Sequence, residues 1–247
     1  GRAAAAAAPE PAGMGPVYEA LAGRAAALEP GGRGGAGRRP VLVGLAGAPG
    51  SGKSTAAAAV CQRLDGAVVL PMDGFHLWRS ELEAMPDPKE AFRRRGAPWT
   101  FDAEGFVAAV RSLRSPGEEV LFPGFDHGVG DPVPGAVRVA AGTRVVLLEG
   151  NYLLLSDSPW GEIRDLLDEA WFLDCTEEEA MARVAGRHQS VGRSEQEAWA
   201  RVEGNDRPNS QLVAASAPRA DVLVPGSPPP PPGRGGQCLL REQRRAP

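Results

Sequence analysis

Cysteine is scarce in this sequence, and long apolar runs and an excess of basic charge are missing from it. Its 247 residues include only three cysteines, Cys61, Cys175 and Cys238, and no C-x-x-C pair. This pattern suits a reducing compartment and gives no sign of a zinc site. No apolar run approaches the length of a membrane-spanning helix, which favours a soluble protein without membrane segments. The net charge of -4 argues against a general nucleic-acid binder, although it excludes no local basic site.

The composition divides the chain into three parts. Residues 1–39 are rich in Ala, Gly and Arg, and "VYEALAGRAAALEP" (17–30) within them predicts one amphipathic helix. Such a beginning is typical of low-complexity sequence and also of an organelle transit-peptide remnant. We therefore expect a cytoplasmic protein, with an organelle stroma or matrix as the alternative. Residues 225–247 predict a disordered, Pro-rich tail, which leaves 40–224 as the folded domain.

Strand and helix patterns alternate through the folded domain. Short apolar runs typical of buried strands lie at 41–46, 67–71, 144–149, 170–174 and 221–224. Helical patterns lie between them, most clearly at 53–64, 102–114, 176–187 and 194–204. This alternation predicts an α/β fold in which helices cover both faces of a parallel sheet. Residues 118–140 break the rhythm and predict two short strands, an insertion beside the main sheet.

The most informative stretch is "GLAGAPGSGKST" (44–55), which joins the first predicted strand to the first predicted helix. It matches the phosphate-binding loop G-x-x-x-x-G-K-[ST]. Glycines let successive backbone N–H groups approach phosphate oxygens, and the helix adds free amides and its positive dipole end. We expect ATP to contact Gly47, Ala48, Pro49, Gly50, Ser51, Gly52, Lys53, Ser54 and Thr55. Within this set Lys53 reaches the β and γ phosphates, and the Ser54 hydroxyl ligates Mg²⁺.

Two carboxylates follow predicted strands and should lie near the same phosphates. Ligands gather beyond the carboxyl ends of parallel strands, and Asp73 in "PMDGFHLW" directly follows the second strand. Asp73 can accept a hydroxyl proton or hold Mg²⁺, although Asp-Gly is also typical of an Asx-turn. Glu149 ends the apolar run "RVVLLE" and is a second candidate for the Mg²⁺ site. Its alternative role is a helix N-cap, for which Asn151 and Ser156 are better placed.

Six motifs, in order, resemble the phosphoribulokinase/uridine kinase superfamily. They are "GAPGSGKST", "MDGFH", "RRRGAPWTFD", "FPGFDHG", "LLEGNYLLL" and "RHQSVGRSEQEA…NDRPN". The resemblance covers roughly residues 40–224 and is strongest to the nucleoside/nucleotide-kinase-like branch related to bacterial-type pantothenate kinase. It implies a P-loop NTPase fold with a five-stranded parallel sheet and a helical lid. It also implies ATP, Mg²⁺ and phosphoryl transfer to a hydroxyl of a small molecule.

The resemblance gives roles to several residues. Asp73 becomes the candidate base and Glu149 a magnesium-site carboxylate, while Arg187 and Arg183 belong to the lid that closes over the phosphates. A plain helix surface paired to "TEEE" (176–179) is the alternative for these two arginines. "NDRPN" (205–209) is interpreted as a turn between helices.

"RRRGAPWTFD" corresponds to the superfamily's substrate-side segment. Arg95 is its best candidate contact, because guanidinium binds carboxylate or phosphate in a bidentate fork. Arg93 and Arg94 are equally well explained as a solvated run. His76, Phe125 and His127 are candidates for an aromatic-lined acceptor pocket, with core packing as the alternative. Asp102 should cap the helix that follows it.

The leading hypothesis is an ATP-dependent kinase that acts on a small hydroxylated molecule, with an anionic metabolite favoured as the acceptor. The alternatives are a uridine or cytidine kinase, a plain ATPase, and a nucleotide-binding regulatory protein without kinase activity. ATP and the acceptor are the expected partners, with neither nucleic acid nor membrane, and a homodimer is left open.

Overall fold

The computed structural model describes residues 10–29, 39–115, 119–228 and 239–243. The ranges 1–9, 30–38, 229–238 and 244–247 belong to the two ends for which low complexity, a transit remnant or polyproline is expected, and at these positions those expectations lie outside the described residues. The main sheet contains β1 (Val41–Gly47), β2 (Ala67–Pro71), β5 (Val145–Gly150), β6 (Glu169–Asp174), β7 (Val222–Pro225) and β8 (Arg241–Glu242). The longer helices are α1 (Gly15–Ala27), α2 (Lys53–Cys61), α5 (Ala103–Ser112), α7 (Glu177–Ser190), α8 (Glu195–Arg201) and α9 (Arg207–Ala215).

The strand order is β2-β5-β1-β6-β7-β8. The first five strands are parallel, and they form where the sequence predicts strands. The sheet nevertheless has six strands and not five, because β8 pairs antiparallel with β7. β8 lies within the tail that the sequence suggested was disordered, so that expectation fails at these two residues. The two expected strands of the insertion are β3 (Val120–Asp126) and β4 (Asp131–Val139), an antiparallel hairpin of its own.

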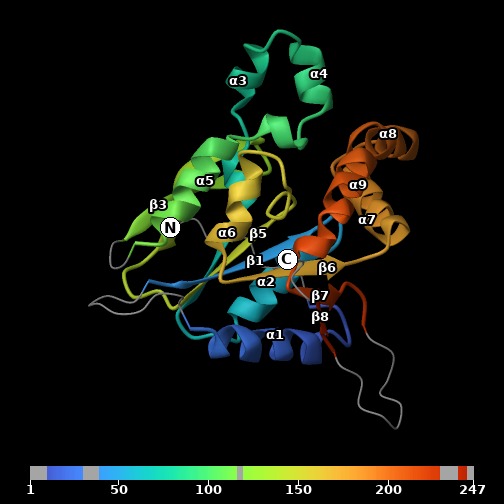
Figure 1. The fold of residues 1–247 in the computed structure, drawn as a ribbon. Coiled ribbons are helices and arrows are strands. Elements are labelled where there is room, and N and C mark those ends of the chain that lie inside the picture. The colour runs from blue at the N-terminus through green and yellow to red at the C-terminus, as the bar shows by residue number, and fades with distance from the viewer. Residues whose placement is uncertain (1–9, 30–38, 116–118, 229–238, 244–247) are drawn as a thin grey trace.

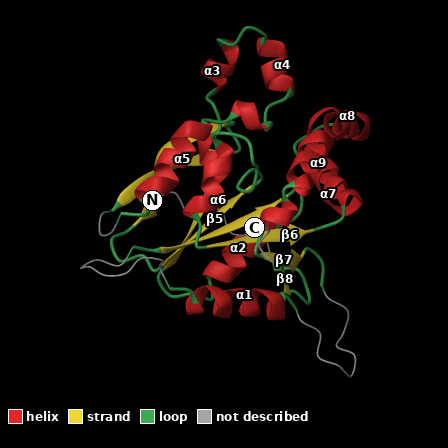
Figure 2. Cartoon of the chain, in the orientation of Figure 1, coloured by secondary structure: helices red, strands yellow, loops and turns green. Residues whose placement is uncertain are grey.

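Helices cover both faces of the sheet, as Figures 1 and 2 show. Alternate residues of one strand face opposite sides: Leu42 packs with one cluster, and Val41 and Val43 with the other. α5 and the short α6 (Ile163–Leu166) cover the first face, while α1 and α2 cover the second. The helix predicted in the N-terminal segment is thus α1, and it shares the core of the folded domain.

Two arms rise beyond the carboxyl ends of the strands (Figure 1). One carries α3 (Arg79–Glu83) and α4 (Pro88–Arg93), and the other carries α7, α8 and α9. The α7–α9 arm has a small core of its own, in which Met181 and Val184 pack against Val202. The π-helical turn Val202–Asp206 joins α8 directly to α9, so "NDRPN" is not the turn that the sequence suggested.

Side-chain caps fix where the helices begin. The Asp102 carboxylate accepts from the Gly105 amide at 2.8 Å, which confirms the predicted cap of α5. Thr176 caps α7 in the same way, with 3.3 Å between its hydroxyl oxygen and the Glu179 amide nitrogen. The cap fixes the residue at which α7 begins, and with it the positions of Arg183 and Arg187 along the helix.

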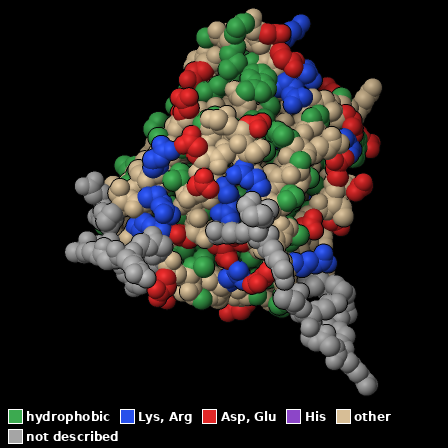
Figure 3. All heavy atoms as spheres, in the orientation of Figure 1, with side chains coloured by type: hydrophobic (Ala, Val, Ile, Leu, Met, Phe, Trp, Pro, Cys, Tyr) green, Lys and Arg blue, Asp and Glu red, His purple; other side chains and the backbone are tan. Residues whose placement is uncertain are grey.

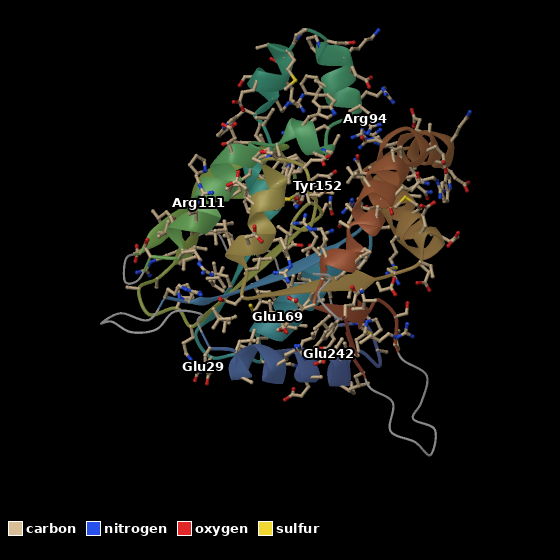
Figure 4. The ribbon with its side chains drawn as sticks, viewed as in Figure 1. Glu29, Arg94, Arg111, Tyr152, Glu169 and Glu242 are labelled. Carbon is tan, nitrogen blue, oxygen red and sulfur yellow. The ribbon has the colours of Figure 1, made fainter. Side chains whose placement is uncertain are left out.

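A buried carboxylate joins α1 and β8 to the sheet. Glu169 on β6 is 5% exposed, and it accepts from Arg24 Nε at 2.7 Å and from Trp171 Nε1 at 2.8 Å. Arg24 also donates to Glu242 on β8 at 2.8 Å. Figure 4 shows Glu169 and Glu242 beside α1. Arg24 is thus the cation that compensates a charge removed from water.

We predict that Arg24→Met lowers the free energy of unfolding by about 2 kcal/mol, because it leaves the Glu169 charge buried without its cation. Arg138→Met is the matched control, since its partner Glu119 and Arg138 itself are exposed, and it should cost about 0–1 kcal/mol. Urea denaturation measures both. The double change Arg24→Met with Glu169→Gln should recover most of the loss. Equal losses for the two single variants would contradict this account.

Candidate active site

The glycine-rich loop joins β1 to α2 at the carboxyl end of the sheet. Gly50 and Gly52 adopt φ angles of 80° and 96°, which L side chains rarely allow. A Cβ on Gly50 would stand 2.2 Å from the carbonyl oxygen of Ala180 on α7. The loop therefore has its shape because glycine lets it pass directly beneath the α7–α9 arm.

A cavity of about 540 Å³ opens above this loop. It is lined by loop residues from Pro49 to Thr55 and by Asp73, Glu149, Asn151, Arg183 and Arg187. The structure thus brings together the predicted ATP loop, both predicted carboxylates and both predicted lid arginines. They come from the loop after β1, from α2, from the turn after β2, from the end of β5 and from α7.

Two charged side chains of this cavity are shielded from water, Lys53 half-buried and Glu149 buried. The Lys53 ammonium donates to the Ala48 carbonyl at 3.2 Å. Burial lowers the pKa of Lys53, while the charges of Glu149 and Asp73 oppose that shift. Burial likewise raises the pKa of Glu149 to about 6, and Lys53 opposes the change. Lys53 and Glu149 partly compensate each other, whereas the charge of Asp73 favours the charged form of Lys53 and disfavours that of Glu149. No direct contact joins Lys53 to a carboxylate among the residues described.

The oxygen atoms around Glu149 fit a magnesium ion. Glu149 Oε1 accepts from the Ser54 hydroxyl at 3.1 Å, whereas Glu149 Oε2 is buried and has no hydrogen-bond partner in the described chain. The described residues contain no group of three or more Asp, Glu, His or Cys that could hold a metal. Mg²⁺ in kinase sites is held by one or two carboxylates, with substrate phosphates and waters completing most of its coordination. The donor set of Ser54, Glu149 and Asp73 is of that kind.

Asp73 lies in the 3₁₀ turn Met72–Phe75 directly after β2. In the described part of the chain, its carboxylate has neither a hydrogen-bond nor an ion-pair partner. The geometry therefore lacks the bond to a nearby amide that defines an Asx-turn. Its backbone carbonyl accepts from the His76 amide at 3.2 Å and from His76 Nδ1 at 2.8 Å. The turn is thus held by the backbone and His76, and the carboxylate faces the cavity.

Arg183 and Arg187 approach the loop from α7. Arg183 lies 3.4 Å from the Gly50 carbonyl oxygen and 3.5 Å from that of Ser51. Neither arginine forms an ion pair within the described ranges, so the suggested pairing to "TEEE" is not observed. The acidic side chain of Glu177 pairs with Arg207 instead.

The remaining predicted site residues form a second group beside the first. The centre of the His76 ring lies 4.0 Å from that of the Phe101 ring and 4.6 Å from that of the Phe125 ring. The ring centres of Phe125 and His127 are 5.2 Å apart. Arg95 is 5.8 Å above the Phe125 ring and donates to the Leu77 carbonyl at 2.9 Å. Arg95, Phe125 and His127 do not line the cavity that contains Asp73. His76 lines a separate hollow of about 370 Å³, next to the β3–β4 hairpin.

The Nε2 atom of His76 can accept a hydrogen bond. Burial lowers its pKa, against the opposing effect of Asp73, so the ring is neutral near pH 7. Because Nδ1 must donate to the Asp73 carbonyl, Nε2 is the unprotonated nitrogen.

Asn151 is a site residue that sequence reasoning missed. The sequence suggested it as a helix cap, but it lines the Asp73 cavity, and its Oδ1 is buried without a hydrogen-bond partner in the described residues. The signal was its place two residues after Glu149, at the end of a strand whose six residues are all buried. A polar side chain there faces the same edge of the sheet.

Known proteins are similar to this chain in sequence and in overall fold. A protein of Schizosaccharomyces pombe whose name, given by inference, is uridine kinase is 40% identical to this chain over 193 residues. The match covers 74% of this chain and 82% of that protein. An ATP-dependent kinase-like protein of Aspergillus versicolor is 41% identical over 162 residues, 63% of this chain and 94% of that protein. A solved structure from Silicibacter sp. TM1040, named by inference a fructose transport system kinase, has a TM-score of 0.74 at 36% identity. That match covers 83% of this chain and 97% of the other.

Phosphoribulokinase from Rhodobacter spheroides shares the fold, with a TM-score of 0.55 at 13% identity over 76% of this chain and 70% of the other. The chain belongs to the phosphoribulokinase/uridine kinase superfamily. It is a kinase of the P-loop class with an ATP-binding loop. No family model matches the sequence. Among the described residues, no helix of this P-loop kinase is long and apolar enough to cross a membrane.

We predict that Gly50→Ala abolishes ATP binding. The new Cβ would collide with α7, and the alanine would have to keep a positive φ that L residues rarely adopt. Gly186→Ala is the matched control on α7, where nothing lies within 4 Å of the new Cβ. The control should bind ATP normally and gain up to about 1 kcal/mol of stability, since alanine is the better helix former. Calorimetric titration with ATP and thermal unfolding measure both. Normal ATP affinity in Gly50→Ala would contradict the loop geometry.

Proposed function

We propose that this P-loop kinase transfers the γ-phosphoryl group of ATP to a hydroxyl of a small molecule, preferably one that bears a carboxylate or phosphate. The observation that carries the proposal is the Asp73 carboxylate. It has no partner among the described residues and lines the same cavity as the phosphate-binding loop and the α7 arginines. An acceptor hydroxyl that enters this cavity meets a base and the phosphates together.

The loop amides and Lys53 would hold the β and γ phosphates, and Arg183 and Arg187 would cover them from α7. A bound Mg²⁺, held by Ser54 and Glu149 with Asp73 near, would neutralise phosphate charge. The half-buried position of Lys53 strengthens its attraction for the phosphates, because less water competes there than at the surface. Closure of the α7–α9 arm would exclude water from the γ-phosphate.

In the proposed transfer, the acceptor oxygen attacks the γ-phosphorus while the bond from that phosphorus to the bridging β,γ-oxygen breaks. The hydroxyl proton passes to Asp73, ADP leaves, and the acceptor becomes a phosphate ester. Asp73 suits this role because its carboxylate has no other partner among the residues that the structure describes, and because the bonds to His76 fix the turn that carries it.

The acceptor would extend from Asp73 toward the second group of residues. We propose that Arg95, His76, Phe125 and His127 line its outer side, with Nε2 of His76 accepting from a further hydroxyl or amide. Arg95 carries a buried Nε without a hydrogen-bond partner in the described chain, which supports a polar contact there. A uridine- or cytidine-type acceptor is the second candidate, favoured by the row of rings from Phe101 to His127 and by the inferred name of the S. pombe relative.

A regulatory nucleotide-binding protein without kinase activity is the remaining alternative. Loss of the base or of the arm arginines would favour it, yet Asp73, Lys53, Glu149 and Arg187 are all present at one cavity. An ADP-release screen over nucleosides, hydroxy acids, sugars and sugar phosphates tests the proposal. Turnover that depends on one acceptor class supports a kinase, and ADP release that no acceptor changes indicates an ATPase. ATP binding without any ADP release indicates the regulatory protein.

We predict that Asp73→Asn lowers kcat by about 10²–10⁴-fold, the usual contribution of a general base, and changes ATP affinity little. The amide keeps the size of the side chain but cannot take the proton. Steady-state kinetics with the best acceptor and calorimetry with ATP give the two values. An unchanged kcat would remove Asp73 from the mechanism.

Lys53→Met should lower turnover by at least about 100-fold, the typical loss for one group that stabilises transition-state charge. The methionine keeps most of the buried volume, and it removes an ammonium that is costly to bury, so the fold should persist. Turnover assays and circular dichroism check the two parts. Near-normal turnover in a folded Lys53→Met protein would show that the loop does not act on the phosphates.

A further inference from the structure

The turn that carries Asp73 is held between two separate elements of the fold. On one side it packs against the end of β5, where a Cβ on Gly150 would stand 2.6 Å from the Cβ of Met72. On the other side it packs against the β3–β4 hairpin, where a Cβ on Gly74 would stand 2.0 Å from the carbonyl oxygen of Pro123. Asp73 lies in the chain between the two contacts, so both bear on its position.

The contact between Gly74 and the hairpin joins backbone to backbone. The same added Cβ would stand 2.6 Å from the carbonyl carbon of Pro123 and 3.1 Å from the amide nitrogen of Gly124. Gly74 does not adopt a positive φ, so the position needs glycine for space alone. Backbone atoms cannot rotate away as the tip of a side chain can. An alanine at this position would therefore force the turn and the hairpin apart.

The hairpin is irregular at the residue that makes this contact. Phe122 pairs with Val137 and Gly124 pairs with Val133, so Pro123 alone faces the three β4 residues 134–136. Proline has no N–H to donate, and it therefore costs the ladder no hydrogen bond at such a point. Irregularities of this kind bend a strand and occur often beside active sites. Here the irregular point is the part of the hairpin that approaches the Asp73 turn.

No side-chain bond fixes the Asp73 carboxylate within the described part of the chain, so its direction follows the backbone of the turn. The Asp73 carbonyl accepts from His76, as described above, and the Phe75 carbonyl accepts from the Asp102 amide at 2.8 Å. These bonds hold the end of the turn. The contact at Gly74 acts on the peptide directly after the base, and Gly74 itself lines the separate hollow and not the Asp73 cavity.

We propose that Gly74 is a positioning residue for the phosphoryl transfer. Its contact with Pro123 lets the β3–β4 hairpin set the direction in which the Asp73 carboxylate enters the cavity. The hairpin also carries Phe125, two residues after Pro123, so one element aligns the base and the outer side of the acceptor. A general base must lie within hydrogen-bond reach of the hydroxyl that it deprotonates. This inference rests on the proposed function and adds the element that aligns its base.

The first variant is Gly74→Ala. It should lower kcat by about 10- to 100-fold, because a misplacement of about 1 Å can cost about 10²-fold. Its affinity for ATP should stay within about twofold of wild type, because the phosphate-binding loop and the α7 arginines are not touched. Gly23→Ala on α1 is the matched control, since nothing lies within 4 Å of the new Cβ, and it should leave both values unchanged. Steady-state kinetics with the best acceptor, calorimetry with ATP and circular dichroism measure these effects.

A double-mutant cycle tests whether Gly74 acts through the base. In an Asp73→Asn background, Gly74→Ala should change kcat by less than about twofold, because the group that it misplaces no longer takes the proton. Losses that add in the double variant would overturn the inference. A normal kcat in a folded Gly74→Ala protein would also overturn it, while a slow Asp73→Asn protein would leave the proposed function standing. An unchanged kcat in Asp73→Asn would remove the base, and the positioning role with it.

A second pair of variants moves the hairpin without changing the turn. Gly124→Ala places a Cβ 2.9 Å from the Cβ of Ala136 on β4, which displaces β3 beside Pro123. It should lower kcat and leave ATP affinity unchanged, and adding Ala136→Gly should restore kcat to within about twofold of wild type. This pair decides the question if Gly74→Ala does not fold. A normal kcat in Gly124→Ala, or a loss that Ala136→Gly does not restore, would contradict the role of the hairpin.

Discussion

The constraint on which the site depends is the nearness of two charges that are partly or fully removed from water: the half-buried Lys53 at the start of α2 and the buried Glu149 on β5. Strand register explains the position of Glu149, which pairs with Leu45 on β1 and with Pro71 on β2. It therefore lies between the strand that leads into the loop and the strand that leads to Asp73. Buried charges are costly unless a ligand or a partner compensates them. A triphosphate with its magnesium ion supplies charges of both signs, which is the compensation that this arrangement requires.

The two arms place the less buried residues around this centre. Arg201 on α8 donates to the carbonyl oxygens of Arg93 and Arg95, the latter at 2.9 Å, and Tyr152 holds the Gly96 carbonyl from the end of β5. The segment after α4 is thus fixed by both the α7–α9 arm and the sheet. Because of these bonds, a movement of that arm over the phosphates would also move residues 93–95. On the face that Figure 3 shows, acidic and basic side chains are interspersed.

Much of this could be predicted from the sequence, because its signals are local. Apolar runs and the glycine pattern were enough for the five parallel strands and for the loop, and the rule that ligands gather at the carboxyl ends of parallel strands placed Asp73 and Glu149 at one edge. β8 could not be predicted, since two exposed residues gain a strand conformation only by pairing with β7. "NDRPN" was misread because Asn and Pro are typical turn residues, whereas here Pro208 occupies the first turn of α9, where its missing N–H costs nothing.

The contact partners of individual side chains could not be predicted from the sequence for a similar reason. Nothing local distinguishes Arg93, Arg94 and Arg95, and their different burial comes from the hairpin and from α9, far away in the chain. Asn151 was equally hidden, because its role depends on the end of β5 facing a cavity and not on its own neighbours. Such contacts between distant segments decide which polar groups remain free for a ligand.

The central claim is that phosphate passes from ATP to an organic hydroxyl at Asp73. The most direct test follows the label of γ-³²P-ATP in a reaction with a mixture of hydroxylated metabolites, for wild type and for Asp73→Asn. The account predicts that wild type places the label in an organic phosphate ester and that Asp73→Asn does so far more slowly. Label that appears only as inorganic phosphate, or equally fast ester formation by Asp73→Asn, would contradict it.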